Sequence, residues 1–373
     1  MKLLFAIKGL HQAAGGAERV IGDVCSHLAD QHGHDVSVLT FDRPGAAPFY
    51  PLSRKVRLIQ LGIGDSRAPT SMRTLVRRIH ALRQAVGSEA PDVVVAFMHS
   101  MFIPMSFALA GTRIPLVASE HIVRGYYRSR RVQFALFAAA IPFISRVTVL
   151  SESIAREYPR WIQRKMVTVT NPISPSFRKK VESSKQEDPC RILSIGRFSE
   201  RKGHATLLAA FASLAHEFPG WSLRIVGEGV QRPVLLREAK RLGLQDRVSL
   251  PGAASDVAQE LADASFFALA SKYESFGLVI IEAMACGKAS VALADCQGVS
   301  DVIDDGETGL LVRGTDPIKS MADGLRSLII SKRQREEMGR LARKRVFTRY
   351  SIEQVCDRWE SILRNVCRPA QQL

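Results

Sequence analysis

The chain has 373 residues and a mass of 41.2 kDa, which is enough for two domains that each have a hydrophobic core. Hydrophobic residues make up 46% of it and charged residues 24%, so intrinsic disorder is excluded as the main state. The formal net charge is +16. A charge of this size predicts an anionic partner, which could be a nucleic acid, an anionic membrane surface or a substrate that carries phosphate.

The excess of positive charge lies in the N-terminal half. Residues 1–170 hold 22 basic and 11 acidic side chains, against 30 and 25 in residues 171–373. Residues 54–131 alone hold 13 basic and four acidic side chains. Because a solvated surface spreads its charges more evenly, this pattern favours a basic face directed at a partner.

Six cysteines are spread widely along the chain, with no Cys-x-x-Cys pair and no spacing typical of zinc ligands. We therefore expect reduced thiols in a cytoplasmic protein and no metal site. The apolar run at the N-terminus is too short for the core of a signal peptide and is expected to be a buried strand. Two other apolar stretches, Met101–Leu109 and Val132–Ile144, are shorter than the roughly 20 residues of a bilayer span, but either could lie against a membrane.

Short runs rich in Val, Ile and Leu alternate with stretches of helical periodicity, which predicts an α/β fold with parallel sheets of the doubly wound type. In the first half we expect a helix at 17–29 and strands at residues 2–7, 35–41, 92–97, 115–119 and 146–151. Residues 171–189 contain three prolines and many charges, so a linker is expected there. The alternation then resumes, with a last helix at 352–366 and strands at 190–196, 222–226, 247–250, 265–270 and 288–293.

Two Rossmann-like domains follow from this pattern. The first covers residues 1–172 and the second residues 173–350, while residues 351–373 form a C-terminal helix that is expected to pack back toward the first domain. Open parallel sheets bind ligands at the carboxyl ends of their strands. The loops that follow strands are therefore the places to search for functional residues.

Two adjacent glycines, Gly15 and Gly16, follow the first expected strand. They allow the backbone to approach a ligand closely and expose N–H groups at the start of a helix, which favours phosphate. A plain tight turn would explain the pair equally well. The full Gly-x-Gly-x-x-Gly spacing is absent, which argues against a bound NAD.

The loop after the strand at 190–196 carries two cations, Arg197 and Lys202. Two fixed cations in such a loop could hold a diphosphate without a metal ion. Taken in isolation, an exposed basic loop is the simpler interpretation, and Arg201 is expected to be a surface charge of that kind. In the first domain, His121 follows the strand at 115–119, so it is expected at the carboxyl end of a strand and is a further candidate site residue. A lone histidine, however, is more often structural.

An expected helix at 278–286 contains one acid, Glu282, among apolar residues. A buried carboxylate must be paired or must bind a polar group, so a functional role is favoured. Were the segment helical throughout, Glu274 and Glu282 would lie about 12 Å apart, which is comparable with the distance from ribose to hexose in a nucleotide sugar. Gly277, at the start of the helix, adds backbone donors for phosphate.

Together these motifs resemble the retaining glycosyltransferases of group 1, also called type 4, which have the GT-B fold of two Rossmann-like domains facing across a cleft. The resemblance covers essentially the whole chain, and its specificity lies in the order and spacing of the motifs. These are Gly15-Gly16-Ala-Glu18, Ser119-Glu-His121, Gly196-Arg197-x4-Lys202, Val226-Gly-Glu-Gly229 and Glu274-x7-Glu282 followed by Ala283-x2-Ala285-x-Gly287. Within the family, the chain is most similar to bacterial enzymes that extend lipid-linked or surface polysaccharides.

The resemblance implies a catalytic role for four residues. Arg197 and Lys202 would bind the donor diphosphate and stabilise the leaving group. Glu274 would contact the donor sugar near its 3-hydroxyl, and we leave its role as a base open. His121 would contact the 6-hydroxyl and the reacting centre.

The resemblance also implies a set of donor contacts. Glu282 would accept hydrogen bonds from the ribose hydroxyls, and the base would lie near Gly227 and Gly229. Backbone N–H groups would bind the phosphates or the sugar. They come from Ser275, Phe276 and Gly277 and, in the opposite domain, from Gly15 and Gly16.

The implied chemistry is sugar transfer with retention of the anomeric configuration. Negative charge develops on the leaving phosphate, so preformed cations directed at it lower the barrier. The sequence has no Asp-x-Asp triplet to hold a divalent ion across the diphosphate, and metal-independent transfer is therefore expected. In a front-face mechanism the donor phosphate helps to deprotonate the acceptor hydroxyl, and no protein nucleophile is needed.

Two segments of the first domain are candidates for contact with a membrane or with an acceptor. In Met72–Val86 the apolar residues share one side and Arg73, Arg77 and Arg78 are basic, which is typical of an interfacial helix, although a core-packing helix is at least as common. The second candidate comprises Tyr126, Arg128 and Arg130, which could instead hold an acceptor diphosphate.

We therefore expect a cofactor-independent hexosyltransferase on the cytoplasmic face of the inner membrane. Its donor would be a nucleotide sugar, with UDP favoured over GDP, and its acceptor a polyprenyl-diphosphate-linked or surface polysaccharide. One alternative is a soluble enzyme of the same fold, such as a sugar-nucleotide 2-epimerase or a disaccharide synthase. The other is a nucleic-acid-binding protein, which is disfavoured because aromatic residues are only 7% and do not alternate with the basic residues.

Overall fold

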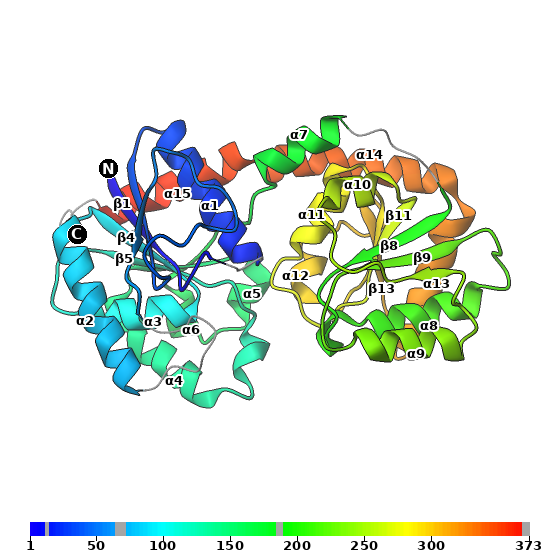
Figure 1. Cartoon of the computed structure of the whole chain (residues 1–373), viewed down its shortest axis with the longest axis horizontal. Helices are drawn as coiled ribbons and strands as arrows, with labels where there is room; N and C mark the ends of the chain where they lie inside the picture. The colour runs from blue at the N-terminus through cyan, green and yellow to red at the C-terminus, as the bar shows by residue number, and fades with distance from the viewer. Residues whose placement is uncertain (12–14, 64–71, 184–188, 368–373) are drawn as a thin grey trace. The chain divides into compact units, whose positions relative to one another are not determined.

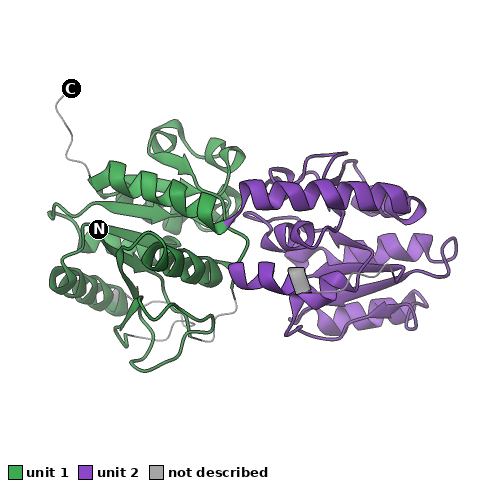
Figure 2. Ribbon diagram, turned by 90° about the horizontal axis from the view of Figure 1, so that it is seen from above, with its two compact units in different colours: residues 1–174, 352–373 green, residues 175–351 purple. Residues whose placement is uncertain are grey.

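Figure 1 shows the computed structural model of the chain, in which residues 1–11, 15–63, 72–183 and 189–367 are described. The chain divides into two compact units (Figure 2). Unit 1 comprises Met1–Ser174 and Ile352–Leu373, and unit 2 comprises Pro175–Ser351. Each contains one parallel sheet with helices on both faces, so the expected α/β class with two Rossmann-like domains is confirmed.

Unit 1 is built on a seven-stranded parallel sheet in the order β3-β2-β1-β4-β5-β6-β7. The strands are β1 (Lys2–Ala6), β2 (Asp35–Thr40), β3 (Arg57–Gln60), β4 (Val93–Phe97), β5 (Leu116–Ser119), β6 (Arg146–Val149) and β7 (Met166–Thr168). The helices are α1 (Gly16–Asp30), α2 (Met72–Glu89), α3 (His99–Ala108), α4 (Arg131–Ala140), α5 (Glu152–Arg156), α6 (Arg160–Gln163) and α15 (Ile352–Cys367), with 3-10 turns η1 (Arg124–Tyr127) and η2 (Ile141–Phe143). The central strand β4 is buried at every position, which explains its uninterrupted apolar sequence.

Unit 2 has a six-stranded parallel sheet in the order β10-β9-β8-β11-β12-β13. The strands are β8 (Arg191–Ile195), β9 (Ser222–Val226), β10 (Val248–Ser249), β11 (Phe266–Leu269), β12 (Ser290–Leu293) and β13 (Gly309–Val312). The helices are α7 (Pro175–Ser183), α8 (His204–Leu214), α9 (Arg232–Arg241), α10 (Val257–Ala262), α11 (Leu278–Ala285), α12 (Gln297–Ser300), α13 (Pro317–Ile330) and α14 (Lys332–Arg349), with the 3-10 turn η3 (Glu200–Lys202). In Figure 1, α8, α9 and α13 lie on one face of this sheet, and α10, α11 and α14 lie on the other.

Three strands that the sequence did not predict are β3, β7 and β13. All three lie at sheet edges, have three or four residues and are only partly buried. An edge strand needs no continuous apolar run, because one side of it faces away from the sheet. The apolar pattern that located the central strands is therefore absent at these positions.

The segment expected to be a linker, 171–189, is not a plain linker. It contains α7, which packs against α10 and α11 and so belongs to unit 2. Phe177 and Val181, four residues apart on one face of α7, are buried and anchor it. Of the residues that indicated a linker, Pro175 is the first residue of this helix and Arg178, Lys179 and Lys180 are exposed on it, while residues 184–188 lie outside the described part.

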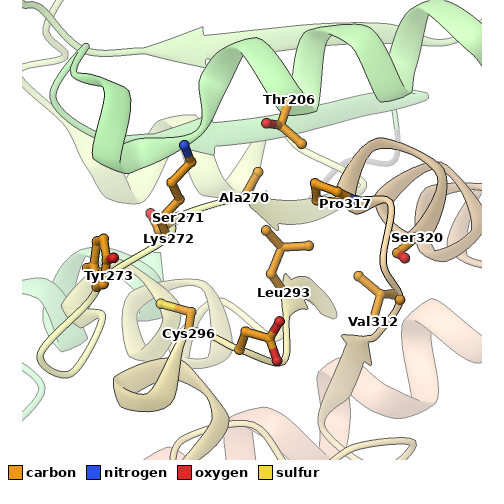
Figure 3. A pocket seen from close by; sticks show the side chains of 12 residues that line it. Thr206, Ala270, Ser271, Lys272, Tyr273, Leu293, Cys296, Val312, Pro317 and Ser320 are labelled. Carbon is orange, nitrogen blue, oxygen red and sulfur yellow. The ribbon is translucent and has the colours of Figure 1, made fainter. Parts of the chain in front are cut away.

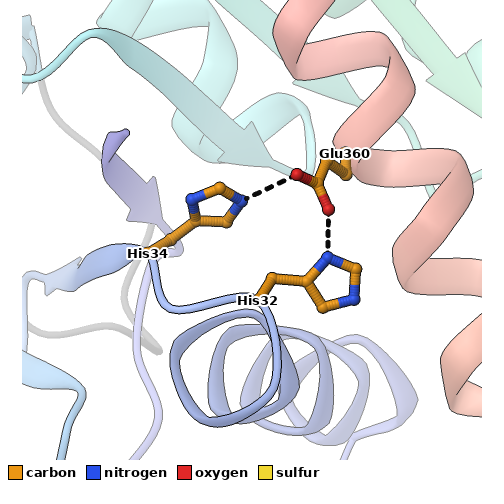
Figure 4. Close-up of side chains that lie close together, drawn as sticks. All are labelled: His32, His34 and Glu360. Atoms are coloured by element: carbon orange, nitrogen blue, oxygen red, sulfur yellow. Dashed lines mark hydrogen bonds and ion pairs between the residues drawn. The ribbon is translucent and has the colours of Figure 1, made fainter.

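The C-terminal helix α15 contributes to the core of unit 1. It packs on α1 and β4, and its Trp359 lies with its ring centroid 6.0 Å from that of Phe97. A polar cluster also joins α15 to the turn after α1 (Figure 4). There Nδ1 of His32 forms a hydrogen bond with Oε2 of Glu360, and Nε2 of His34 lies 3.5 Å from Oε1 of the same carboxylate.

Both sheets have a topological switch point, where the strand order reverses between two neighbours. In unit 1 it lies between β1 and β4, and in unit 2 between β8 and β11. Open α/β sheets bind ligands in the crevice beyond the carboxyl ends of the strands at such a point. The loops after these strands are therefore the first place to look for a site in each unit.

Candidate functional site

An ion pair joins the two loops at the switch point of unit 2. Nζ of Lys202 lies 2.5 Å from Oε1 of Glu274, and the Ser271 hydroxyl donates a hydrogen bond to the same oxygen over 2.8 Å. The Lys202 and Glu274 side chains are only 20% and 13% exposed. Two residues that are far apart in the sequence thus form one polar group at the carboxyl ends of β8 and β11.

Gly203 explains how these two loops come so close. Its φ is +64°, and a Cβ atom placed there would lie 1.9 Å from the carbonyl oxygen of Ala270 at the end of β11. The Lys272 amide also donates a hydrogen bond to the Arg201 carbonyl over 2.8 Å. Any side chain at position 203 would therefore push the Lys202 loop away from the Glu274 loop.

Arg197, the other candidate cation of this loop, differs from Lys202 in its exposure and in its pairing. Its side chain is exposed, and it makes no ion pair with any residue in the described part of the chain. Arg201 is also exposed, as expected for a surface charge. The site therefore offers one guanidinium that is open to an incoming anion and one ammonium that is already balanced by a carboxylate.

Gly227 and Gly229 hold the next loop, which follows β9, against the β8 loop. Their φ values are +149° and +152°, and a Cβ atom would lie 2.0 Å from the Gly196 carbonyl oxygen at the first and 2.4 Å from the Phe198 carbonyl oxygen at the second. The Phe198 amide donates to the Glu228 carbonyl over 2.8 Å. This packing alone requires glycine at both positions, and their role in binding a base stays a prediction.

The acids at either end of the Glu274–Glu282 motif have different surroundings. Glu274 lies in a loop, and the helix α11 begins only at Leu278, so the distance of about 12 Å that assumed a continuous helix does not apply. Glu282 lies inside α11 and is 5% exposed. Gly277 begins the helix with φ +73°, a left-handed conformation that favours glycine.

The remaining donor candidates, Ser275 and Phe276, lie in the same loop. Phe276 is buried, and its ring meets that of Tyr350 edge to face at 5.5 Å. The Phe276 side chain therefore anchors the loop, while the backbone of 275–277 forms the approach to α11. The contact that we predict between these residues and the phosphates or sugar of the donor would therefore come from their backbone N–H groups.

The sequence analysis missed the loop after β12. At Gly298 a Cβ atom would lie 2.3 Å from the Glu274 carbonyl oxygen, so this loop supports the Glu274 loop. Cys296 lies two residues before Gly298, and burial raises the pKa of its thiol to about 12. Figure 3 shows an adjoining pocket of about 360 Å³, which Ser271, Asp295, Cys296 and residues of α8 and α13 line. A glycine shortly after an apolar strand was the only signal for this loop.

His204 is a second residue of unit 2 that the sequence did not reveal. It is the first residue of α8, is 3% exposed, and its ring lies edge to face with Phe198 at 5.4 Å. Burial lowers its pKa to about 4. A neutral imidazole therefore lies beneath the Arg197 and Lys202 loop and adds no charge to it.

In unit 1, His121 lies just past the end of β5. Its Nε2 is 3.0 Å from the Ser119 hydroxyl, and its ring stacks on Phe97 with 4.9 Å between the centroids. Burial lowers its pKa to about 4, so the imidazole is neutral near pH 7. It can exchange a hydrogen bond with a sugar hydroxyl but carries no charge for a phosphate.

Glu120, between Ser119 and His121, has a structural role. It accepts a hydrogen bond from the Tyr127 hydroxyl over 2.5 Å and another from the Ile122 amide over 3.1 Å. Burial raises its pKa to about 7. These bonds hold the 122–127 segment against the end of β5.

The switch point of unit 1 carries a histidine that we did not predict. His99 begins α3, directly after Met98, which has an unusual φ of +68° for a residue other than glycine. Burial, with a smaller effect of Arg130, lowers the pKa of His99 to about 4. The glycines expected at this switch point, Gly15 and Gly16, lie at the start of α1, where Gly15 is the extended residue before the helix.

The basic residues on α2 do not form one surface. The apolar side of this helix, with Leu82 and Val86 buried, packs toward α3, as in an ordinary core-packing helix. Arg73 and Arg77 are exposed, but Arg78 is only 3% exposed. Its guanidinium lies 4.5 Å from the centre of the Phe41 ring and donates to the Ile63 carbonyl, so Arg78 cannot contact a membrane as expected.

The second expected contact segment, with Tyr126, Arg128 and Arg130, surrounds the start of α4. Arg128 and Arg130 are exposed, and the Arg130 guanidinium lies 4.0 Å above the Tyr126 ring. No helix in the described residues is both long enough and apolar enough to cross a membrane.

One group of side chains in the described residues has the composition of a metal site, namely His32, His34 and Glu360. Figure 4 shows both imidazoles directed at the one carboxylate. Burial would raise the pKa of Glu360, but hydrogen bonds from His32 and Arg364 outweigh this effect and lower it to about 2. Because the Arg364 guanidinium also bonds Oε1 of Glu360, cations of the chain itself already satisfy the carboxylate.

Comparisons with known proteins agree with this geometry. The family model for glycosyl transferases group 1 matches residues 176–345, and that for glycosyltransferase family 4 matches residues 14–177. An uncharacterized glycosyltransferase of Haemophilus influenzae is 28% identical over 94% of this chain and 97% of its own length. A Campylobacter jejuni α-1,4-N-acetyl-D-galactosaminyltransferase named for an undecaprenol-diphosphate acceptor is 27% identical, covering 98% of this chain and 99% of the relative.

Among solved structures, the chain is similar to HepE of Anabaena in complex with UDP and glucose. The two superpose with a TM-score of 0.75 at 20% identity, covering 98% of this chain and 100% of HepE. At that identity the likeness establishes the fold alone, which is GT-B.

Proposed function

The chain belongs to the group 1 glycosyltransferases of family 4, and on this basis we propose that it moves a hexose-type sugar from a UDP-sugar to a polyprenyl-diphosphate-linked acceptor. The transfer retains the anomeric configuration and needs no metal ion. Unit 2 binds the donor and unit 1 the acceptor. The observation that carries the proposal is the polar group at the switch point of unit 2, where Lys202 pairs with Glu274 in a loop that also carries the exposed Arg197.

The charges in this group suit a nucleoside diphosphate. Arg197 is open to an anion, and Lys202 is held by Glu274 until a stronger anion arrives. A diphosphate attracts both cations, after which Glu274 is free to accept a hydrogen bond from the donor sugar. As the glycosidic bond breaks, both cations then stabilise the developing charge on the leaving phosphate.

The other donor contacts lie on the neighbouring loops. In this proposal Glu282 accepts hydrogen bonds from the ribose, while the backbone of Ser275, Phe276 and Gly277 donates to the phosphates or the sugar. The base lies along the loop of Gly227 and Gly229. The UDP in the similar HepE structure supports uracil over guanine.

The choice of acceptor rests on a relative and on charge. The Campylobacter jejuni relative is named for a saccharide on undecaprenol diphosphate, and it matches this chain from end to end. The diphosphate of such an acceptor is a second anion that suits the basic first half of the chain. Because an acceptor with a polyprenyl tail lies in a membrane, we propose that the enzyme works at the cytoplasmic face of the inner membrane.

Thermal unfolding with a panel of UDP- and GDP-sugars tests the donor. A ligand at 100 times its Kd stabilises the fold by about 2.7 kcal/mol, so the right donor raises the Tm clearly. We expect UDP and one UDP-sugar to do so. Stabilisation by GDP-sugars alone would refute the choice of base.

Incubation of the protein and that donor with an undecaprenyl-diphosphate saccharide tests the acceptor, with mass spectrometry of the products. We expect the mass of one added sugar, and NMR of the product should show that the new linkage has the α configuration. Conversion of the donor without any lipid acceptor would instead favour an epimerase or a disaccharide synthase.

A further inference from the structure

The outer face of α4 is apolar and exposed, which is unusual for a helix on a water-facing surface. Val132 is 74% exposed and Leu136 38%, and Ala135 and Ala139 are exposed on the same side. These positions follow the i, i+3, i+4, i+7 spacing that places residues on one helix face. Phe143, in the following turn η2, is also 45% exposed, with its ring centroid 6.1 Å from that of Phe107.

The inner face of α4 shows that this exposure does not come from a poorly packed helix. Phe137 is fully buried, with its ring centroid 5.1 Å from that of Phe102 and 6.0 Å from that of Tyr158. Ala140 is buried as well. The helix is therefore fixed in unit 1 by one apolar side and presents a second apolar side to the surroundings.

Charged residues border this face but do not interrupt it. Residues 132–145 contain no charged side chain, and residues 121–151 contain five arginines and no acid. Arg128, Arg130 and Arg131 are exposed at the start of α4 and line a shallow pocket of about 560 Å³. None of the three makes an ion pair with another described residue, so their charge is available to a partner.

We propose that Val132, Ala135, Leu136, Ala139 and Phe143, which we call the α4 face, insert into the interfacial region of an anionic bilayer while Arg128, Arg130 and Arg131 bind lipid phosphates. An apolar helix face with basic residues at its border is the pattern of a helix that lies in the plane of a membrane surface. The inference rests on the proposed function in one respect, since a lipid-linked acceptor is what gives the enzyme a reason to bind there.

Lipid fits this surface better than a second copy of the chain. A symmetric pairing of two α4 faces would bring the arginine groups of both copies together, and Glu157, which interacts electrostatically with Arg128, would balance only part of their charge. Anionic headgroups supply that balance, and acyl chains cover the apolar residues. The α4 face also differs from α2, on which Leu82 and Val86 are buried and Arg78 is internal.

Sedimentation of the full chain with vesicles tests the proposal. We expect binding to vesicles of phosphatidylcholine with phosphatidylglycerol, weaker binding to phosphatidylcholine alone, and a decrease with salt. The double variant Val132→Asp with Leu136→Asp should lose at least about tenfold in partitioning. Replacing all three arginines by Gln should weaken binding and flatten its dependence on salt.

Two matched controls make the test specific. Val76→Asp changes an exposed valine on α2, and Val230→Asp changes an exposed valine in unit 2, with exposures of 60% and 85%. Both should bind vesicles like the wild type. Loss of binding in Val76→Asp with retention in the α4 double variant would overturn the proposal in favour of α2, and equal binding of all variants would overturn it outright.

Further measurements distinguish this proposal from a protein interface at the α4 face and from the proposed function itself. Unfolding midpoints that match the wild type show that the α4 double variant is folded, and transfer to a short-chain, water-soluble acceptor should remain while transfer to acceptor in vesicles falls. If the variant instead abolished a dimer detected by light scattering and left vesicle binding intact, the α4 face would be a protein interface and the proposal wrong. Vesicle binding without transfer to any lipid-linked acceptor would refute the proposed function alone.

Discussion

The sheets of the two units have the same kind of switch point, but the loops around it carry different polar groups. In unit 2 the loops after β8 and β11 carry Arg197 and the Lys202–Glu274 ion pair. In unit 1 the loop after β4, at the switch point, carries His99, and the loop after the next strand, β5, carries His121. Burial lowers the pKa of both imidazoles to about 4, and Lys8, just after β1, contributes to the lowering at His99. The site loops of unit 2 thus carry an ion pair and an exposed guanidinium, whereas those of unit 1 carry two neutral imidazoles.

This difference separates two tasks. A diphosphate needs cations that do not titrate near pH 7, and Arg and Lys provide them. A sugar hydroxyl can both donate and accept a hydrogen bond, and an imidazole of low pKa can bind it in either way without adding charge. Four changes to the protein or its solution test this separation, beginning with the loss of a cation and ending with the removal of metal ions.

Removing the Lys202 ammonium should have the largest effect on turnover. We expect Lys202→Ala to lower kcat/KM by roughly 10²- to 10³-fold, because a preorganised donor to the leaving phosphate is lost. Glu282→Gln, at a buried position of the same unit, should also reduce activity severely. The matched control is Arg201→Ala, an exposed cation one residue away, which should remain within about twofold of wild type. Full activity in both Lys202→Ala and Glu282→Gln would refute the site.

The close approach of the two loops in unit 2 can be tested through stability. Gly203→Ala would place a Cβ atom 1.9 Å from the Ala270 carbonyl oxygen, and we expect it to destabilise the fold by about 3 kcal/mol or more. Gly243→Ala is the control, since Gly243 has a similar φ of +68° with nothing within 4 Å of a Cβ. It should cost only about 1 kcal/mol in urea unfolding. Equal losses would mean that backbone conformation, and not contact between the loops, explains Gly203.

The neutral state of His121 has a consequence for pH dependence. Its pKa of about 4 lies below the value of 6.5 for a free imidazole, so it loses its proton well below neutral pH and stays uncharged as pH rises. We expect His121→Asn to lower kcat about tenfold through one lost hydrogen bond, by the same factor from about pH 5.5 to 8. A ratio of wild-type to variant rates that changed near pH 6.5 would show that His121 titrates during turnover.

Chelation should have no effect. The cations that we propose for the diphosphate belong to the protein, so turnover with excess EDTA should equal turnover with added Mg²⁺ or Mn²⁺. Steady-state rates after dialysis against the chelator provide the measurement. Loss of activity that Mn²⁺ restores would show that a metal ion shares the role that we propose for Arg197 and Lys202.

Much of the fold followed from apolar periodicity. The central strands, such as β4 and β11, were located because buried parallel strands are apolar at almost every position. Edge strands such as β3 carry polar residues and gave no such signal. The helix α7 was hidden for a related reason, because only Phe177 and Val181 of its sequence mark a buried face.

The candidate site was only partly visible in the sequence. Residues with unusual spacing, such as Arg197, Lys202 and Glu282, stood out in their motifs. His99, His204 and Gly298 did not, since a histidine at a helix start or a glycine in a loop has many ordinary explanations. Their positions became informative only when the strand order showed that they lie at or beside the switch points.

Periodicity is a property of the chain, and it was enough to predict the two-domain α/β class. The motifs resemble those of a known family, and that resemblance implied which residues would carry charge to a diphosphate. Which of those charges are available depends on the tertiary structure. It pairs Lys202 with Glu274, leaves Arg197 open, buries Arg78 against Phe41 and exposes the apolar side of α4. Burial and pairing depend on neighbours that are distant in sequence, and they determine whether a given side chain acts as a charge, a neutral hydrogen-bonding group or part of the core.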